Sequence, residues 1–252
     1  MNSAWFRPDW PAPQNVKSVC TTRLGGVSLP PYDSLNLATH VGDAPELVLQ
    51  NRQYLINDAD LPQEPTWLDQ QHTDLCIHLP LVAENALAGS VPVADAAWTG
   101  NANQLCTVMT ADCLPILLCD LVGSKVVAVH AGWRGVHQCI IEKSVRSAGL
   151  VAGQFIAWIG PAIHQAHFEV GGELLEAFCQ LNPDYERFFK RSEQKTDKFL
   201  ADLIGMAREQ LLDSGCKAVY GGNLCSYSDE TRFFSYRRDG RCGRMATIIW
   251  LD

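Results

Sequence analysis

The sequence lacks the features of a disulfide scaffold and of a membrane protein. Its ten cysteines lie singly, with no Cys-x-x-Cys pair, whereas a disulfide-stapled domain would be shorter and richer in loops. No apolar run approaches the length of a membrane span, and the first residues, MNSAWFRPDWPAP, contain no basic region followed by an apolar stretch. We therefore expect a reducing, cytoplasmic compartment and no membrane partner.

A positive net charge and the common nucleotide-binding loops are also missing. The formal net charge is -8 at pH 7, so a nucleic-acid partner, which needs a basic face, is not expected. A small anionic substrate would therefore depend on local arginines. No Walker A or G-x-G-x-x-G loop occurs, and the zinc-deaminase signature of H-x-E followed by P-C-x-x-C is absent.

What is present favours one large domain. A chain of 252 residues with 47% hydrophobic content can bury a sizeable core, and no repeat, low-complexity tract or linker divides it. The pattern of segments predicts a single α+β domain over residues 1–252, with mixed β-sheets flanked by helices. The sequence does not fix the oligomeric state, for which we favour a monomer.

Local patterns assign strands and helices along the chain. Short runs rich in β-branched residues predict strands over 17–23, 74–79, 91–98, 105–111, 115–120, 125–130, 155–159, 217–220, 233–236 and 245–251. Apolar residues at helical spacing predict helices over 43–56, 135–148, 172–181 and 200–213. The first of these helices starts with the spacing of a capping box at Asp43 and Glu46, and Gly215 is expected to end the last one.

The stretch 105–135, LCTVMTADCLPILLCDLVGSKVVAVHAGWRG, carries most of the functional signal. If its second and third strand runs form a hairpin through the Gly-Ser turn, Asp120 lies near Lys125 and Pro115 pairs with His130. This register brings Cys113 and His130 to the same open end of the hairpin, where diagonal neighbours are about 7 to 8 Å apart. The turn therefore predicts a Cys-His pair.

Two kinds of chemistry suit this pair. With a second imidazole it would form a tridentate zinc site with an open fourth position, the arrangement of catalytic zinc, but spacing does not choose the third ligand among His72, His78, His137 and His40. Alternatively, Cys113 is a thiolate nucleophile with His130 as its base and Asp112 nearby. A chelator would abolish only the zinc activity, whereas an alkylating reagent would abolish both.

Three further segments hold candidate substrate-binding groups. Residues 132–135 precede a predicted helix, so their backbone amides and Arg134 could hold an anion. A strand-to-helix turn that needs glycine, with Arg134 on the surface, explains the same residues equally well. A long polar loop after residue 23 contains Arg23, Asn36 and His40, which could instead be solvated. The basic turn RRDGRCGR offers a phosphate contact, with Cys242 as a candidate reactive thiol, or a plain surface turn.

Six motifs in this order and spacing give the chain a family resemblance: TTRLGGVS, SLNLATHVGD, TADCLPILLCD, VHAGWRG, IGPAI and FFSYRRDG. They resemble the YfiH-type family, also called the laccase-domain or multicopper polyphenol oxidase family and the purine nucleoside phosphorylase family. The resemblance covers about residues 17–251. It implies the YfiH-like α+β fold and a zinc site formed by His72, Cys113 and His130, with the same three residues also counted as catalytic.

The resemblance also implies an activity. The expected reaction is phosphorolysis of adenosine, inosine, guanosine and methylthioadenosine to base and ribose 1-phosphate, with adenosine deamination beside it. Purine nucleosides and phosphate are the expected partners, and Arg23, Asn36 and Arg134 are the candidate substrate-binding residues.

Two alternatives belong to other reaction classes: a copper-dependent polyphenol oxidase and a Cys-dependent hydrolase that edits peptidoglycan precursors. Too few histidines stand near the motifs for a multicopper centre, which disfavours copper. Thr73, His167, Phe168 and Cys242 depart from the family's usual pattern, and this leaves the preferred nucleoside open.

Overall fold

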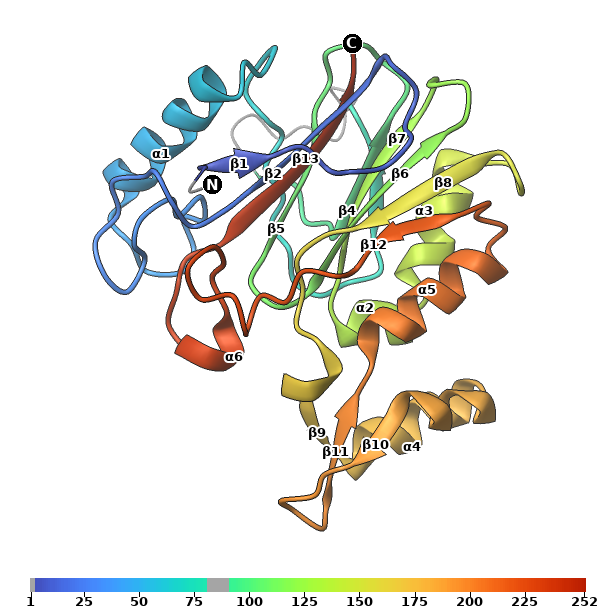
Figure 1. The fold of residues 1–252 in the computed structure, drawn as a ribbon. Coiled ribbons are helices and arrows are strands. Elements are labelled where there is room, and N and C mark those ends of the chain that lie inside the picture. Colours follow the sequence, from blue (N-terminus) through green and yellow to red (C-terminus); the bar gives the residue numbers. More distant parts are fainter. Residues whose placement is uncertain (1–2, 81–90) are drawn as a thin grey trace.

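Within the described residues the strands form three sheets (Figure 1). The structure, a computed structural model, describes residues 3–80 and 91–252. The largest sheet has the order β12-β8-β6-β7-β4-β3. Its strands are β3 (Cys76–His78), β4 (Ala96–Thr99), β6 (Leu114–Asp120), β7 (Val126–Ala131), β8 (Phe155–Ile159) and β12 (Val219–Gly221). The β3–β4 and β12–β8 pairs are parallel and the others antiparallel, so the predicted α+β class with mixed sheets is confirmed.

A four-stranded antiparallel sheet packs against one face of this sheet. Its order is β1-β2-β13-β5, and its strands are β1 (Trp5–Phe6), β2 (Val16–Thr21), β5 (Cys106–Thr110) and β13 (Met245–Leu251). Val108 and Ile249 from this sheet share a buried apolar cluster with Leu117 and Ala128 from the larger sheet. Strands buried on both faces need apolar residues in succession, which is why β6 reads LPILLCD without polar alternation.

Helices cover the two outer faces of this sandwich (Figure 1). Helix α1 (Pro45–Asp58) packs Leu55 against Val19 of the four-stranded sheet. Helices α3 (Ile140–Ala148) and α5 (Leu203–Asp213) lie on the far side, where Val145 and Leu211 pack with Val129 of the six-stranded sheet. The other helices are α2 (Trp133–His137), α4 (Gly172–Leu181) and α6 (Tyr236–Asp239), with 3-10 turns at Gln165–His167 and Pro183–Phe188. None of the helices in the described ranges is long and apolar enough to cross a bilayer.

A small lobe projects from the body at the bottom of Figure 1. It combines α4 with a three-stranded sheet in the order β10-β11-β9, formed by β9 (Glu169–Gly171), β10 (Phe189–Arg191) and β11 (Lys198–Ala201). No local sequence pattern predicts these three short strands. The helix predicted over 200–213 therefore starts too early, because Leu200 belongs to β11. Helix α5 begins after Asp202, whose side chain accepts a hydrogen bond from the Gly205 amide at 2.8 Å.

The single helix predicted over 135–148 is wrong. Cys139 adopts a left-handed backbone conformation with φ of +61°, and this residue separates α2 from α3. A left-handed residue cannot continue a right-handed helix, because its carbonyl points away from the helical hydrogen-bond row. The break lets α2 start directly behind β7 while α3 turns to cover the sheet.

Two other local predictions also need correction. Residues 233–236 do not form a strand: Phe233 and Phe234 are fully buried in a small apolar cluster, and the chain then enters α6. Their apolar character reflects burial of a loop rather than strand pairing. The capping box at Asp43 does not form either, since Asp43 lies before the N-cap Ala44 and its Oδ2 accepts hydrogen bonds from Ser28 and Asn36.

Candidate metal centre

The hairpin of β6 and β7 has the register that its sequence predicts. Pro115 pairs with His130, and at the closed end the Lys125 amide donates to Asp120 Oδ1 at 3.1 Å. Cys113 immediately precedes β6, so its side chain lies at the open end beside His130. The hairpin thereby brings a thiol and an imidazole from two adjacent strands to one place.

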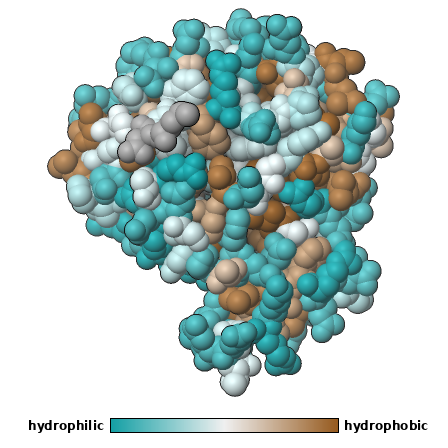
Figure 2. Space-filling view, in the orientation of Figure 1, coloured by the Kyte–Doolittle hydropathy of each residue, from teal (hydrophilic) through white to brown (hydrophobic). Residues whose placement is uncertain are grey.

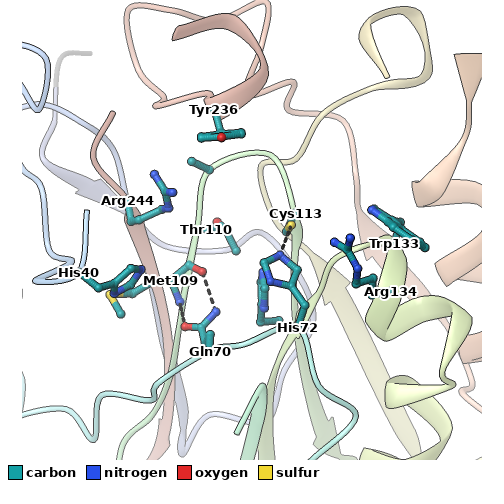
Figure 3. A pocket seen from close by; sticks show the side chains of 12 residues that line it. His40, Gln70, His72, Met109, Thr110, Cys113, Trp133, Arg134, Tyr236 and Arg244 are labelled. Carbon is teal, nitrogen blue, oxygen red and sulfur yellow. Dashed lines mark hydrogen bonds between the residues drawn. The ribbon is translucent and has the colours of Figure 1, made fainter. Parts of the chain in front are cut away.

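A second imidazole comes from a distant segment. His72 lies between α1 and β3, in a left-handed conformation with φ of +58°. Its Nε2 is 3.7 Å from Cys113 Sγ, and its ring meets the His130 ring edge to face, with centroids 4.9 Å apart (Figure 3). One potential ligand atom from each of the three residues lies within 4.8 Å of the others. The structure therefore brings together the three residues that the resemblance implies.

The other candidate histidines lie elsewhere. His78 stacks on the Trp98 ring, with centroids 4.1 Å apart, and His137 Nε2 faces the Ala177 carbonyl at 3.3 Å. His40 lines the same pocket as His72, but Figure 3 places it on the opposite side from Cys113. Long-range packing, which spacing along the chain does not encode, selects His72.

Asp95 orients the His130 ring. The fully buried Asp95 carboxylate lies 2.7 Å from His130 Nδ1, so Nδ1 carries a proton and, when the imidazole is neutral, Nε2 is the nitrogen that can bind a metal. Asp95 directly precedes β4, a strand hydrogen-bonded to β7. A histidine held by a carboxylate on one nitrogen and free on the other is the usual arrangement at metal sites. Sequence reasoning placed Asp95 on a strand but missed this contact.

Without a metal, the contacts within the cluster favour the thiolate form of Cys113 and the imidazolium form of His130. Burial alone would raise the pKa of the Cys113 thiol, but the charge of His130 and hydrogen bonds from His130 and His72 lower that pKa to about 6. Burial would lower the pKa of His130, yet the Cys113 thiolate and the hydrogen bond that His130 donates to Asp95 raise it to about 9. Burial opposes ionisation of Asp95, but the hydrogen bond from His130, the charge of His130 and the two hydrogen bonds from Thr73 together outweigh it and keep the Asp95 pKa below its ordinary value.

The donor set fits a divalent metal ion. A thiolate and two imidazole nitrogens are the ligands that zinc prefers, and three protein ligands leave a fourth position for a substrate or water. The lowered pKa of Cys113 means that this ligand needs little help to deprotonate at neutral pH. All three residues line a pocket, so the fourth position is open to a ligand.

The pocket above this cluster has a volume of about 490 Å³, within the range of small-molecule sites. The residues that line it are His40, Gln70, His72, Met109, Thr110, Ala111, Cys113, His130, Trp133, Arg134, Tyr236 and Arg244. Two arginine–aromatic pairs belong to it: Arg134 lies 4.4 Å from the Trp133 ring centroid and Arg244 lies 5.8 Å from that of Tyr236. The pocket thus combines cationic groups with flat apolar surfaces.

Arg134 is the predicted substrate-binding residue that reaches the pocket. It stands on the first turn of α2, and its exposed guanidinium makes no hydrogen bond or ion pair with the described residues. Gln70 and Tyr236 also line the pocket, and sequence reasoning missed them. Arg244, the last residue of the basic turn RRDGRCGR, lines the pocket too, and Tyr236 directly precedes that turn, so the position of the turn was the available signal.

Arg23 and Asn36, the other predicted substrate-binding residues, are not among the residues that line this pocket. Arg23 Nε donates to the Asp33 carbonyl at 2.8 Å, and its guanidinium lies over the Phe234 ring. Asn36 is fully buried, and its Oδ1 accepts a hydrogen bond from the Arg244 amide at 3.0 Å. These contacts hold the loop in place, and Asn36 also supports the backbone of Arg244, a residue that lines the pocket.

Asp112 and Cys242 also do not have the environments that the sequence suggested for them. Asp112 does not face the Cys113 thiol, because its Oδ1 accepts from Ser226 Oγ at 2.7 Å and its Oδ2 accepts from the Arg237 amide at 2.6 Å. These bonds hold Asp112 at φ of +93°, a strained conformation that sets the turn before β6. Cys242 is buried and its pKa is raised by burial, so it is not a reactive surface thiol.

The protein has an α+β fold with mixed sheets and carries a His-Cys-His cluster at the open end of a hairpin. These two features together define the class to which it belongs. The family model described as "Multi-copper polyphenol oxidoreductase laccase" matches residues 17–252. The chain belongs to this family, and the resemblance seen in its motifs is confirmed.

Relatives cover nearly the whole chain. It is 43% identical over 247 residues to "Purine nucleoside phosphorylase YfiH" of Escherichia coli (strain K12), with 97% of each chain covered. It is 41% identical over 247 residues to "Purine nucleoside phosphorylase" of Haemophilus influenzae, covering 98% of this chain and 99% of that protein. The crystal structure of Neisseria meningitidis protein NMB0706 superposes with a TM-score of 0.91 at 44% identity, over 99% of this chain and 100% of the other.

Proposed function

We propose that this protein is a zinc-dependent purine nucleoside phosphorylase. Its substrates would be adenosine, inosine, guanosine and methylthioadenosine, each converted with phosphate to the free base and ribose 1-phosphate. Adenosine deamination to inosine would be a second activity of the same site. The observation that carries the proposal is the His-Cys-His cluster, which lies in a pocket with an arginine that has no hydrogen-bond or ion-pair partner within residues 3–80 and 91–252. The relatives of this chain are named purine nucleoside phosphorylases.

His72, Cys113 and His130 would hold the metal. When bound, the zinc would polarise a substrate atom as a Lewis acid and, for deamination, activate water. The arrangement of the donors supports this role, since the atoms lie within 4.8 Å of one another and His130 has its other nitrogen fixed by Asp95.

Arg134 would bind the phosphate co-substrate. A guanidinium offers paired N–H donors that match two oxygens of a phosphate, and Arg134 has no competing partner among the described residues. In phosphorolysis a phosphate oxygen forms a bond to the ribose C1′ while the bond from C1′ to the purine nitrogen breaks. The purine leaves with that electron pair and takes up a proton. Arg134 would position the attacking phosphate for this displacement.

Trp133 and Tyr236 would hold the purine. Both rings line the pocket, and Tyr236 is 60% exposed, so a flat purine can reach its face. Stacking between a base and an aromatic side chain contributes about 1 to 3 kcal/mol and tolerates different bases. Such a platform accounts for a substrate range that includes adenine, guanine and hypoxanthine nucleosides.

The test is product analysis with and without phosphate. Metal-loaded protein incubated with inosine should release hypoxanthine and ribose 1-phosphate only when phosphate is present. Adenosine without phosphate should give inosine and ammonia. Hypoxanthine release that does not depend on phosphate would overturn the phosphorylase proposal and indicate a hydrolase.

The Asp95–His130 contact favours one second candidate, a thiol-dependent hydrolase acting on peptidoglycan precursors. Asp95 contacts His130, and His130 contacts Cys113. An aspartate, a histidine and a cysteine in this order can form an activated thiolate without any metal. Treatment with a chelator separates the two candidates, because the thiol hydrolase would retain its activity in the chelator and the zinc enzyme would not. The copper oxidase has less support, since only one cluster of metal-binding side chains occurs in residues 3–80 and 91–252.

A further inference from the structure

The Asp95 carboxylate lies at the junction of two segments that carry histidines of the cluster. It is fully buried and accepts four hydrogen bonds. Oδ1 accepts from the His72 amide at 3.1 Å and lies 2.7 Å from His130 Nδ1. Oδ2 accepts from the Thr73 amide at 2.6 Å and from the Thr73 hydroxyl at 2.7 Å.

The backbone of Asp95 strengthens the same junction. Its carbonyl accepts the His130 amide at 2.7 Å, and its amide donates to the Leu75 carbonyl at 3.1 Å. The side chain and the main chain of one residue therefore tie the 72–75 segment to β7. His72 is held at φ of +58°, a conformation that a histidine rarely adopts without such support.

We propose that Asp95 is a positioning residue for both histidines of the cluster. It fixes the His130 tautomer with Nε2 open, and it holds the backbone that presents the His72 ring. This inference rests on the proposed metal site. Asp95 is not itself a metal ligand, yet its single carboxylate sets the geometry of two ligands from distant parts of the chain.

The substitution Asp95→Asn separates this role from simple space-filling. An asparagine has the same shape but presents an N–H₂ group where one of the two oxygens now accepts. If that group faces Thr73, it meets a backbone N–H that cannot become an acceptor. If it faces His130, the ring must move its proton to Nε2, which is the nitrogen needed for the metal.

The experiment is a measurement of zinc affinity by competition with a chromophoric chelator, together with absorption spectra of the Co²⁺-loaded protein. Asp95→Asn should bind zinc about 10- to 100-fold more weakly, and its Co²⁺ spectrum should change because the ligand geometry changes. Thr73→Val, which removes one of the four hydrogen bonds, should weaken binding by about 2- to 10-fold. Asp120→Asn, at the closed end of the same hairpin, should match the wild type.

A folded Asp95→Asn protein with wild-type zinc affinity and an unchanged Co²⁺ spectrum would overturn the inference and leave the proposed metal site intact. If Asp95→Asn does not fold, Thr73→Val decides: wild-type affinity and an unchanged spectrum in that variant overturn the inference. Failure of the wild-type protein to bind zinc is a different result, because it overturns the metal site itself and the role of Asp95 with it.

Discussion

Gly132 lies so close to His72 that a Cβ atom added at position 132 would be 2.8 Å from His72 Cδ2. The same atom would be 3.0 Å from Cys113 Sγ. Real Cβ atoms do not approach ring carbons this closely, so the two side chains can converge only because residue 132 has no side chain. The glycine of the HAGWRG motif is therefore part of the cluster although it offers no ligand atom.

This contact predicts the effect of Gly132→Ala. The added methyl group should push the His72 ring out of position and lower zinc affinity by at least about tenfold, as the loss of an orienting group does at other metal sites. Gly172→Ala is the matched control, because a Cβ there meets only Phe199 at 3.7 Å, an ordinary contact. Equal zinc affinity in the two variants, measured by chelator competition, would contradict the proposed convergence.

Arg134→Ala should raise the KM for phosphate by about 10- to 100-fold, because a charge-assisted hydrogen bond contributes about 1.5 to 3 kcal/mol. Arg134→Lys should recover part of this loss, since it keeps the charge without the paired donors. Arg146→Ala removes an exposed arginine that pairs with Glu142 on α3, and it should leave the KM unchanged. Steady-state kinetics with varied phosphate will check this, and an unchanged KM for phosphate in Arg134→Ala would exclude the assigned role.

Tyr236→Ala should raise the KM for the nucleoside by about tenfold, in line with a stacking contribution of about 1 to 3 kcal/mol per base. Tyr236→Phe keeps the ring and should behave like the wild type. The KM for phosphate should not move in either variant, because the proposed phosphate contact is Arg134. A loss of similar size in Tyr236→Phe would show that the hydroxyl rather than the ring face binds the substrate.

The pKa of Cys113 predicts how the metal-free protein reacts with iodoacetamide. Only the thiolate reacts, and a pKa lowered to about 6 means that the thiolate persists down to about pH 6. The alkylation rate should therefore rise through about pH 6, whereas an unperturbed thiol rises near pH 8.5. Cys242, whose pKa is raised by burial, is the internal control. Mass spectrometry of the modified peptides provides the measurement, and a Cys113 midpoint near that of a free thiol would refute the electrostatic account.

The sequence predicted the part of the site that a hairpin organises. The Gly-Ser turn and two apolar runs defined β6 and β7, and their register follows from the turn, so the proximity of Cys113 and His130 could be derived. His72 could be named only through family resemblance. Its position depends on packing between segments far apart in the chain and on the buried Asp95, and neither leaves a local pattern.

The places where sequence and structure differ have a common physical cause. Arg23 and Asn36 are polar residues in distinctive motifs, but their side chains satisfy the backbone and neighbours of a long loop, and sequence alone does not tell this role from substrate binding. Cys139 breaks a helix without being glycine or proline, the residues that usually announce a break. In each case tertiary contacts decide what the local sequence leaves open.

The most direct test of the central claim is the zinc content and affinity of the wild-type protein and of three single variants, His72→Ala, Cys113→Ala and His130→Ala. The account predicts one zinc ion per wild-type chain and an affinity at least about 100-fold lower in each variant, because loss of a ligand should exceed the 10- to 100-fold effect of losing an outer-shell partner. His78→Ala, which removes an exposed histidine stacked on Trp98, should retain the metal. A wild-type chain that binds no zinc, or a Cys113→Ala protein that keeps its full zinc content and affinity, would contradict it.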